Sequence, residues 1–96
     1  MANRDRKPVL RRALSHYLRT NEQACDTAAG IARWWMPAGL DVGESEMLPL
    51  LEELRGRGLL TKFSTLDGNW LYRRHRVDAA SDRELEQITR DPNELH

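Results

Sequence analysis

An amphipathic helix that leads directly into a β-hairpin constrains the fold of this chain more than any other feature of its sequence. The apolar side chains of the helix recur at i, i+3, i+4 and i+7 and share one face: Met47, Leu50, Leu51 and Leu54. Pro49 has no N–H to donate, so we expect the helix, within 44–57, to begin near Ser45 or Glu46. Gly56 and Gly58 are candidates for the left-handed residue that ends it.

Two β-prone runs, 59–64 and 70–75, follow the helix, and Asp67-Gly68 lies between them. Asp-Gly is typical of the two-residue type I′ turn, because both residues tolerate a positive φ. The cross-strand pairs expected from such a turn are Phe63 with Tyr72, Thr65 with Trp70, and Lys62 with Arg73. The aromatic pair would stabilise the hairpin, whereas the like-charged pair would weaken it.

Three further helices are expected. The first runs from about Pro8 to Arg19, and residues 20–25 form a loop. The second begins at Asp26 as N-cap and ends before Pro37. The last is opened by a capping box at residues 81–84, Ser-Asp-Arg-Glu, and continues to about Arg90.

The 96 residues are enough for one domain and too few for two. We predict an α+β fold, mostly α, with a three-helix core, a two-stranded hairpin and a short C-terminal helix. The domain spans 8–76. Residues 1–7 are expected to be disordered, and 77–96 to form a tail that contains the helix at 81–90.

The charged residues balance at 15 basic and 15 acidic, but they are segregated along the chain. Residues 1–20 carry six bases and one acid, and residues 21–54 carry one base and seven acids. Residues 55–76 again carry six bases and one acid, whereas 77–96 carry two bases and six acids. Such blocks favour either binding to a charged partner or pairing with one another.

The residues after position 46 carry a resemblance. Met47-x-x-Leu50-Leu51-x-x-Leu54-x-x-x-Gly58-Leu59-Leu60, followed by Asp67-Gly68 and Tyr72-Arg73, resembles the third helix and wing of winged helix-turn-helix regulators of the MarR and ArsR kind. Residues 26–35 look like the second helix of small bacterial winged-helix proteins of uncharacterised function. The resemblance covers roughly 8–76 and implies a putative transcriptional regulator in which the third helix and the wing contact DNA.

Carried onto this chain, the resemblance implies phosphate contacts by basic residues of the hairpin, of the helix before it and of the first helix. The candidates are Arg55, Arg57, Lys62, Arg73, Arg74, Arg76, Arg11 and Arg12. The third helix departs from the pattern, because its outward face carries carboxylates that a phosphate-lined groove would repel. We therefore expect weak, wing-mediated DNA binding. A solvated hairpin neutralised by the acidic blocks remains the alternative.

The alternative function is a protein–protein interaction adaptor, or a self-associating domain such as a homodimer, that does not bind DNA. Its candidate residues are the outward side chains of the third helix and one tryptophan: Trp34, Glu44, Glu46, Leu48, Glu52 and Glu53. Neighbouring helix residues lie about 100° apart, so Trp34 and Trp35 cannot share a face. Trp35 continues an apolar stripe and is expected in the core, with Trp34 at its edge.

The sequence holds no pattern for catalysis, and we expect no enzyme activity, cofactor or small-molecule substrate. His16, His75 and His96 are scattered, and Cys25 lies far from them in sequence, so no metal site is expected. The longest run without a charged residue is seven residues, at 34–40. A membrane span needs about 20 apolar residues. We expect a soluble cytoplasmic protein that does not bind membranes.

Overall fold

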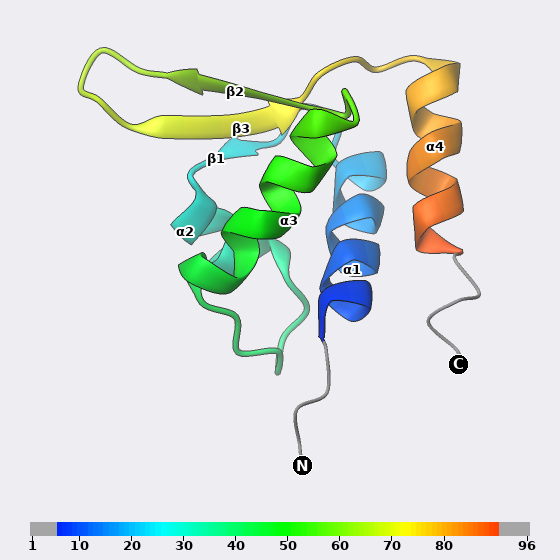
Figure 1. Ribbon diagram of the computed structural model, residues 1–96, viewed down its shortest axis with the longest axis horizontal. Coiled ribbons are helices and arrows are strands. Elements are labelled where there is room, and N and C mark those ends of the chain that lie inside the picture. The colour runs from blue at the N-terminus through cyan, green and yellow to red at the C-terminus, as the bar shows by residue number, and fades with distance from the viewer. Residues whose placement is uncertain (1–5, 91–96) are drawn as a thin grey trace.

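A computed structural model describes residues 6–90, and these form an α+β fold that is mostly helical. The elements in order are α1 (Lys7–Thr20), β1 (Cys25–Asp26), α2 (Ala28–Gly30), the π-helical turn η1 (Ile31–Trp35), α3 (Glu44–Gly56), β2 (Leu60–Ser64), β3 (Trp70–Arg74) and α4 (Ala79–Thr89). The strands form one antiparallel sheet in the order β1-β3-β2. The sheet lies across one end of α1 and α3, and its hairpin extends beyond α2 (Figure 1).

The first helix begins at Lys7, with Arg6 as its N-cap residue. The predicted disorder over 1–7 is therefore wrong for residues 6 and 7, and the rest of that prediction lies outside the described residues. Pro8 occupies the first turn, where its missing N–H costs nothing.

The segment 20–25 is not all loop, because Cys25 and Asp26 pair with β3 and add a third strand to the sheet. Asp26 is consequently not the cap of the second helix. Thr27 takes that place, and its hydroxyl accepts the N–H of Gly30. A Cβ at Gly30 would collide with the Asp26 carboxylate, so a larger residue here would require that side chain to shift.

The third helix begins at Glu44, one or two residues before the predicted start, and holds Pro49 in its interior. Pro49 has no N–H, so the carbonyl of Ser45 lacks its helical hydrogen bond. Both residues are exposed to solvent. Of the two candidate glycines, Gly58 ends the helix with a φ of +79°. The N–H groups of Gly58 and Leu59 donate to the carbonyls of Arg55 and Leu54, the pattern of a Schellman motif.

The hairpin turn differs from the predicted type, and the register shifts with it. Gly68 has a positive φ of 88°, but Asp67 does not, so a type I′ turn is excluded. The N–H of Gly68 donates to the carbonyl of Thr65, and the N–H of Thr65 donates to the carbonyl of Asn69. The loop is thus a three-residue connection, a type I turn followed by a left-handed glycine.

The extra loop residue moves every cross-strand pair by one position. Lys62 lies opposite Tyr72, Phe63 opposite Leu71, and Ser64 opposite Trp70, instead of the three predicted pairs. Because side chains alternate across a strand, the helix-facing side carries Leu60, Lys62, Ser64, Trp70, Tyr72 and Arg74. The outer side carries Thr61, Phe63, Leu71 and Arg73. The predicted clash of Lys62 with Arg73 does not occur.

One hydrophobic core joins all the helices to the sheet. Fully buried leucines of α1 and α3 meet Ile31, Tyr72 and Leu85. Trp35 is buried as predicted and stacks on Tyr17 with ring centroids 4.7 Å apart. Trp34, expected at the edge of the core, is 67% exposed.

The last helix belongs to this core and is not a peripheral tail, because α4 packs along α1 and buries Leu85 completely (Figure 1). Its cap was assigned wrongly from the sequence. Asp78 is the N-cap residue. Its carboxylate accepts the N–H of Ser81, and the Ser81 hydroxyl accepts the N–H of Asp78 in return, which completes a capping box. Ser81 is therefore the third helical residue and the helix starts two residues earlier than predicted.

Candidate functional site

Glu52 of α3 links that helix to the hairpin. The hydroxyl of Tyr72 donates to Glu52 Oε2 across 3.0 Å, and Arg55 Nη2 donates to Oε1 across 2.7 Å. Lys62 Nζ lies 3.8 Å from Oε2. Three donors thus converge on one carboxylate, which has little capacity left for a partner.

These contacts shift two pKa values in opposite directions. The hydrogen bond from Arg55 holds the pKa of Glu52 below its ordinary value, against the effect of desolvation, and Tyr72 contributes a smaller lowering. Burial raises the pKa of Tyr72 to about 12, and its hydrogen bond to Glu52 acts in the same direction. At neutral pH the pair is a neutral phenol that donates to a carboxylate.

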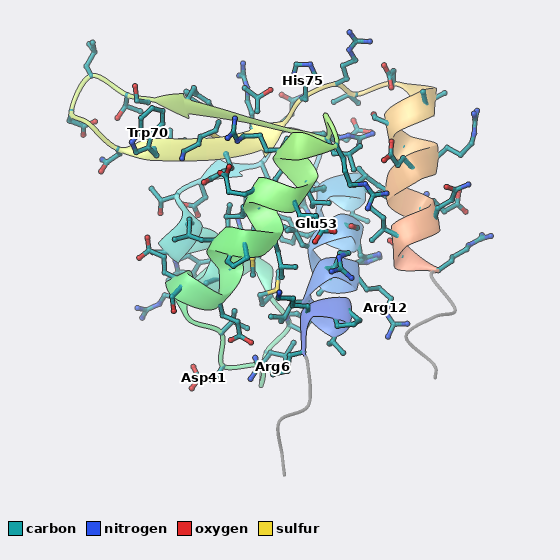
Figure 2. All side chains as sticks on the ribbon, in the orientation of Figure 1. Arg6, Arg12, Asp41, Glu53, Trp70 and His75 are labelled. Atoms are coloured by element: carbon teal, nitrogen blue, oxygen red, sulfur yellow. The ribbon has the colours of Figure 1, made fainter. Side chains whose placement is uncertain are left out.

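Lys62 and Trp70 extend this contact towards the tip of the hairpin. Lys62 Nζ lies 4.9 Å from the ring centroid of Trp70 and 5.7 Å from that of Tyr72. Trp70 is 55% exposed and lies on the part of the hairpin that extends past the helices (Figure 2).

One turn before Glu52 on α3, Leu48 is 37% exposed, and Pro49 beside it is exposed too. Residues four apart are neighbours on a helix surface, which places Leu48 next to Glu52. We name this region the α3–hairpin patch: Leu48, Pro49, Glu52, Lys62 and Trp70. It combines apolar side chains with one internally paired acid and one internally paired base.

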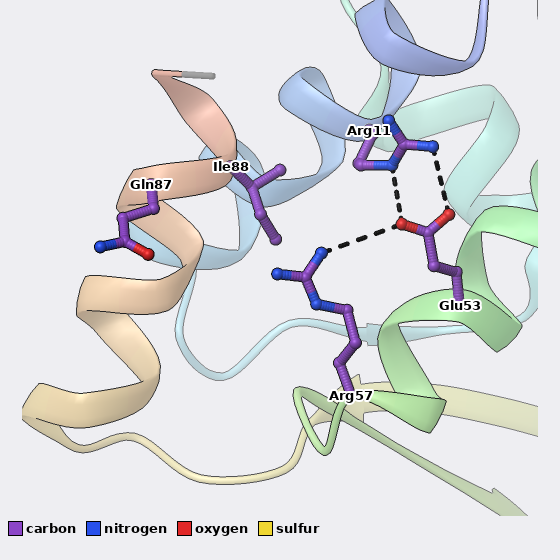
Figure 3. Close-up of a pocket in the computed structure, with 5 residues that line it drawn as sticks. All are labelled: Arg11, Glu53, Arg57, Gln87 and Ile88. Atoms are coloured by element: carbon purple, nitrogen blue, oxygen red, sulfur yellow. Dashed lines mark hydrogen bonds and ion pairs between the residues drawn. The ribbon is translucent and has the colours of Figure 1, made fainter. Parts of the chain in front are cut away.

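Glu53 lies about 100° around α3 from Glu52, and it faces α1 and α4 (Figure 3). Arg11 Nε lies 2.8 Å from Glu53 Oε2 and Arg57 Nη1 lies 3.9 Å from the same oxygen. Arg57 Nε also lies 3.2 Å from Glu84 Oε2. Arg11, Glu53 and Arg57 line a shallow pocket of about 300 Å³, closed on the α4 side by Gln87 and Ile88. Both arginines are therefore engaged with carboxylates of the same chain.

Arg74 is an interior residue, with a side chain only 1% exposed. It donates to the carbonyls of Leu18 and Arg76 and to the Ser81 hydroxyl, and lies 3.7 Å from Asp82. Its assignment as a phosphate contact is wrong, because its donors are used within the fold and are shielded from solvent. The sequence offered one signal: alternation from Tyr72 places Arg74 on the buried side of β3.

Of the two remaining acids of α3, Glu46 is paired with an arginine and Glu44 is not paired within the described residues. Glu46 Oε2 lies 3.2 Å from Arg6 Nε, and Arg6 also donates to the carbonyl of Asp41. Figure 2 shows Arg6 and Asp41 near the N-terminal end of α1. Glu44 is exposed, and no partner for it is recorded among residues 6–90. Three of the four glutamates expected to face outward are thus paired with arginines or lysine of this chain.

The eight basic candidates consequently do not form one surface. Arg11, Arg55, Arg57 and Lys62 pair with glutamates, Arg74 is buried, and Arg12 is half-buried. Arg73 is exposed on the outer side of the sheet, 5.0 Å from the ring centroid of Phe63, with no carboxylate partner in the described residues. Arg76 is 69% exposed and 3.9 Å from Asp78.

Trp34 lies on η1 under the guanidinium of Arg33, 4.9 Å from the ring centroid. Trp70 is not among the candidate site residues predicted from the sequence, which predicts only a cross-strand pairing with Thr65 for it. Correct alternation from the buried Tyr72 would have placed it on the helix-facing side.

Comparisons with protein-family models, curated proteins and solved structures found no match. Within residues 6–90, no helix has the length and apolar character needed to cross a membrane. The same residues contain no cluster of three or more histidine, cysteine or acidic side chains that would hold a metal ion.

Proposed function

We propose that this chain is a winged-helix module that binds a partner protein through the α3–hairpin patch. The order of the elements supports the winged-helix assignment: three helical segments precede a hairpin, and a short strand before the second helix pairs with β3. Such a fold offers the outward side of its third helix and the adjoining hairpin to whatever it binds.

The observation that carries the proposal is the chemistry of that surface. Arg55 and Lys62, the cations beside it, both contact the Glu52 carboxylate, so part of their charge is offset within the chain. Trp70 leaves 55% of its surface exposed next to them. Exposed tryptophans are enriched among residues that dominate protein–protein binding, whereas phosphate binding needs cations with free donors.

The patch also indicates the chemistry of the partner. Leu48, Pro49 and Trp70 fit an apolar side chain, and the paired charges around them give only weak attraction for a polyanion. The partner is therefore a protein that presents an apolar anchor to the patch, with polar groups at its rim.

A photo-activatable amino acid at position 70 tests this proposal, with the same amino acid at position 34 as the matched comparison. Both positions hold exposed tryptophans, but Trp34 is on η1 and outside the patch. We expect a discrete protein adduct from position 70 that Leu48→Ala diminishes and that position 34 does not give. Equal adducts from both positions, or a nucleic-acid adduct from position 70, would contradict the proposal.

Nucleic-acid binding is a second candidate, supported by the exposure of Arg73 and Arg76 at the outer side and base of the hairpin. Two phosphate contacts give a slope of log K against log salt of about −2. This binding would be weak and insensitive to sequence, and Arg73→Ala would remove about half of that slope.

A further inference from the structure

β2 is an edge strand, and half of its backbone groups have no partner in the sheet. It pairs with β3 on one side only (Figure 1). The N–H of Thr65 donates to Asn69, and the N–H of His75 donates to the carbonyl of Leu59. Backbone groups alternate in an antiparallel pair. Residues 59, 61, 63 and 65 therefore point their N–H and C=O groups at β3, and residues 60, 62 and 64 point theirs at the open edge.

The charge of Lys62 does not protect the edge of β2 against pairing with another strand. A lysine in an edge strand normally opposes the addition of another strand. Lys62, however, lies over the ring of Trp70 and near Glu52, which draws its ammonium to the helix side and balances it. Residues 60–64, Leu-Thr-Lys-Phe-Ser, contain neither proline nor an acid. The edge is therefore open to a further strand.

We propose that β2 pairs with β2 of a second copy of this chain, antiparallel, in a register centred on Phe63. Phe63 then meets Phe63, Lys62 meets Ser64, and Thr61 meets Thr65. Lys62 and Ser64 form the hydrogen-bonded pair, using the outward groups of both. Phe63 forms the non-hydrogen-bonded pair, in which side chains approach most closely and an aromatic pair stabilises the sheet.

Other symmetric registers fit less well. An axis at Lys62 places two ammonium groups opposite each other, which is destabilising. An axis at Thr61 places Lys62 against Leu60 and carries the pairing into Gly58, whose positive φ lies outside strand geometry. Of the axes at Thr61, Lys62 and Phe63, only the one at Phe63 avoids both faults, and this self-complementarity favours a second copy as the occupant.

Sedimentation equilibrium of the full chain, at concentrations up to about 1 mM, where even weak association is populated, tests the pairing. Ser64→Pro removes an N–H that faces away from β3, and proline is tolerated at such edge positions. We expect wild type and Ser64→Ala to dimerise and Ser64→Pro to raise the dimer Kd at least about tenfold. A wild-type monomer at every concentration would overturn the proposal, as would an unchanged Kd in a Ser64→Pro variant that keeps its helical circular dichroism.

Oxidative cross-linking tests the register independently of that proline variant. In a Cys25→Ser background, Phe63→Cys should form a disulfide between copies, because residues of a non-hydrogen-bonded pair have Cα atoms about 4.5 Å apart. Thr61→Cys is the matched control, since its two copies lie four residues, about 13 Å, apart along the strands. Rapid cross-linking at position 63 alone supports the register. Equal cross-linking at both positions, at 61 alone, or at neither position excludes it.

Discussion

The phenol of Tyr72 donates a hydrogen bond to the Glu52 carboxylate across 3.0 Å, and this contact joins the hairpin to the third helix. Glu52 is held by Arg55, Lys62 and Tyr72 together, so neither its charge nor theirs is fully available to a ligand.

Tyr72→Phe should destabilise the fold by about 1 kcal/mol, the usual net contribution of one hydrogen bond. Tyr17→Phe is the matched control, because the ring of Tyr17 stacks on Trp35 and no hydrogen bond from its hydroxyl is recorded in the described residues. Urea unfolding measures both variants. Equal stability of the two would show that the contact between Tyr72 and Glu52 contributes nothing.

The pH dependence of stability should include a contribution from Glu52. Its pKa in the folded protein lies below the unfolded value, chiefly through Arg55. A lowered pKa means that this stabilisation is complete above the unfolded pKa and is lost as pH falls through the folded one. We expect urea midpoints to fall on acidification below about pH 4.5. They should fall less steeply in Glu52→Gln, and a slope identical to wild type would contradict this.

Tyr72 should titrate later than an unfolded tyrosine. Tyr72 has a pKa raised to about 12 by burial and by Glu52. An unfolded tyrosine titrates near pH 10. Phenolate absorbance should therefore show one late step, which Tyr72→Phe removes. Because the raised pKa favours the neutral phenol, its stabilisation is lost as pH rises from about 10 towards 12. A late step that survives in Tyr72→Phe would refute the assignment.

Substitution of Arg74 should destabilise the fold more than substitution of its neighbour Arg73. Arg74→Met leaves the carbonyls of Leu18 and Arg76 without their buried donor, and we expect a loss of about 2 kcal/mol, moderated because Asp82 is 40% exposed and keeps its ion pair with Arg19. Arg73→Met removes only an exposed guanidinium and should change stability by less than about 0.5 kcal/mol. Thermal unfolding compares them, and equal effects would be inconsistent with a buried role for Arg74.

Periodicity predicted the helices well, because the apolar side chains of α1 and α3 point inward wherever the helix begins. It did not predict the ends. The second helix is capped by Thr27, because Asp26 pairs with β3 as part of β1. The last helix is capped by Asp78, because it begins before Ser81. A two-residue strand such as β1 has too few side chains to produce a pattern.

The candidate site was harder to predict than the fold, for a physical reason. Acidic and basic blocks are visible in sequence, but which residues pair depends on the packing of α1, α3 and α4 around Glu53 and on a one-residue shift in the hairpin. That shift placed Lys62 opposite Tyr72 and near Glu52, whereas the burial of Arg74 follows from its alternation with Tyr72 along β3. Pairing between distant charges is a tertiary property.

Charge reversal at Glu52 and Glu53 is a poor test of function here, because both residues hold arginines of the same chain and reversal would perturb the fold. A more direct measurement is an anisotropy titration of wild type and Arg73→Ala with duplex DNA at about 50 mM salt, where phosphate contacts are strongest. Our account predicts no saturable binding tighter than about 100 μM, the weak end of non-specific affinities. Micromolar binding that Arg73→Ala abolishes would contradict it and establish the hairpin as a nucleic-acid interface.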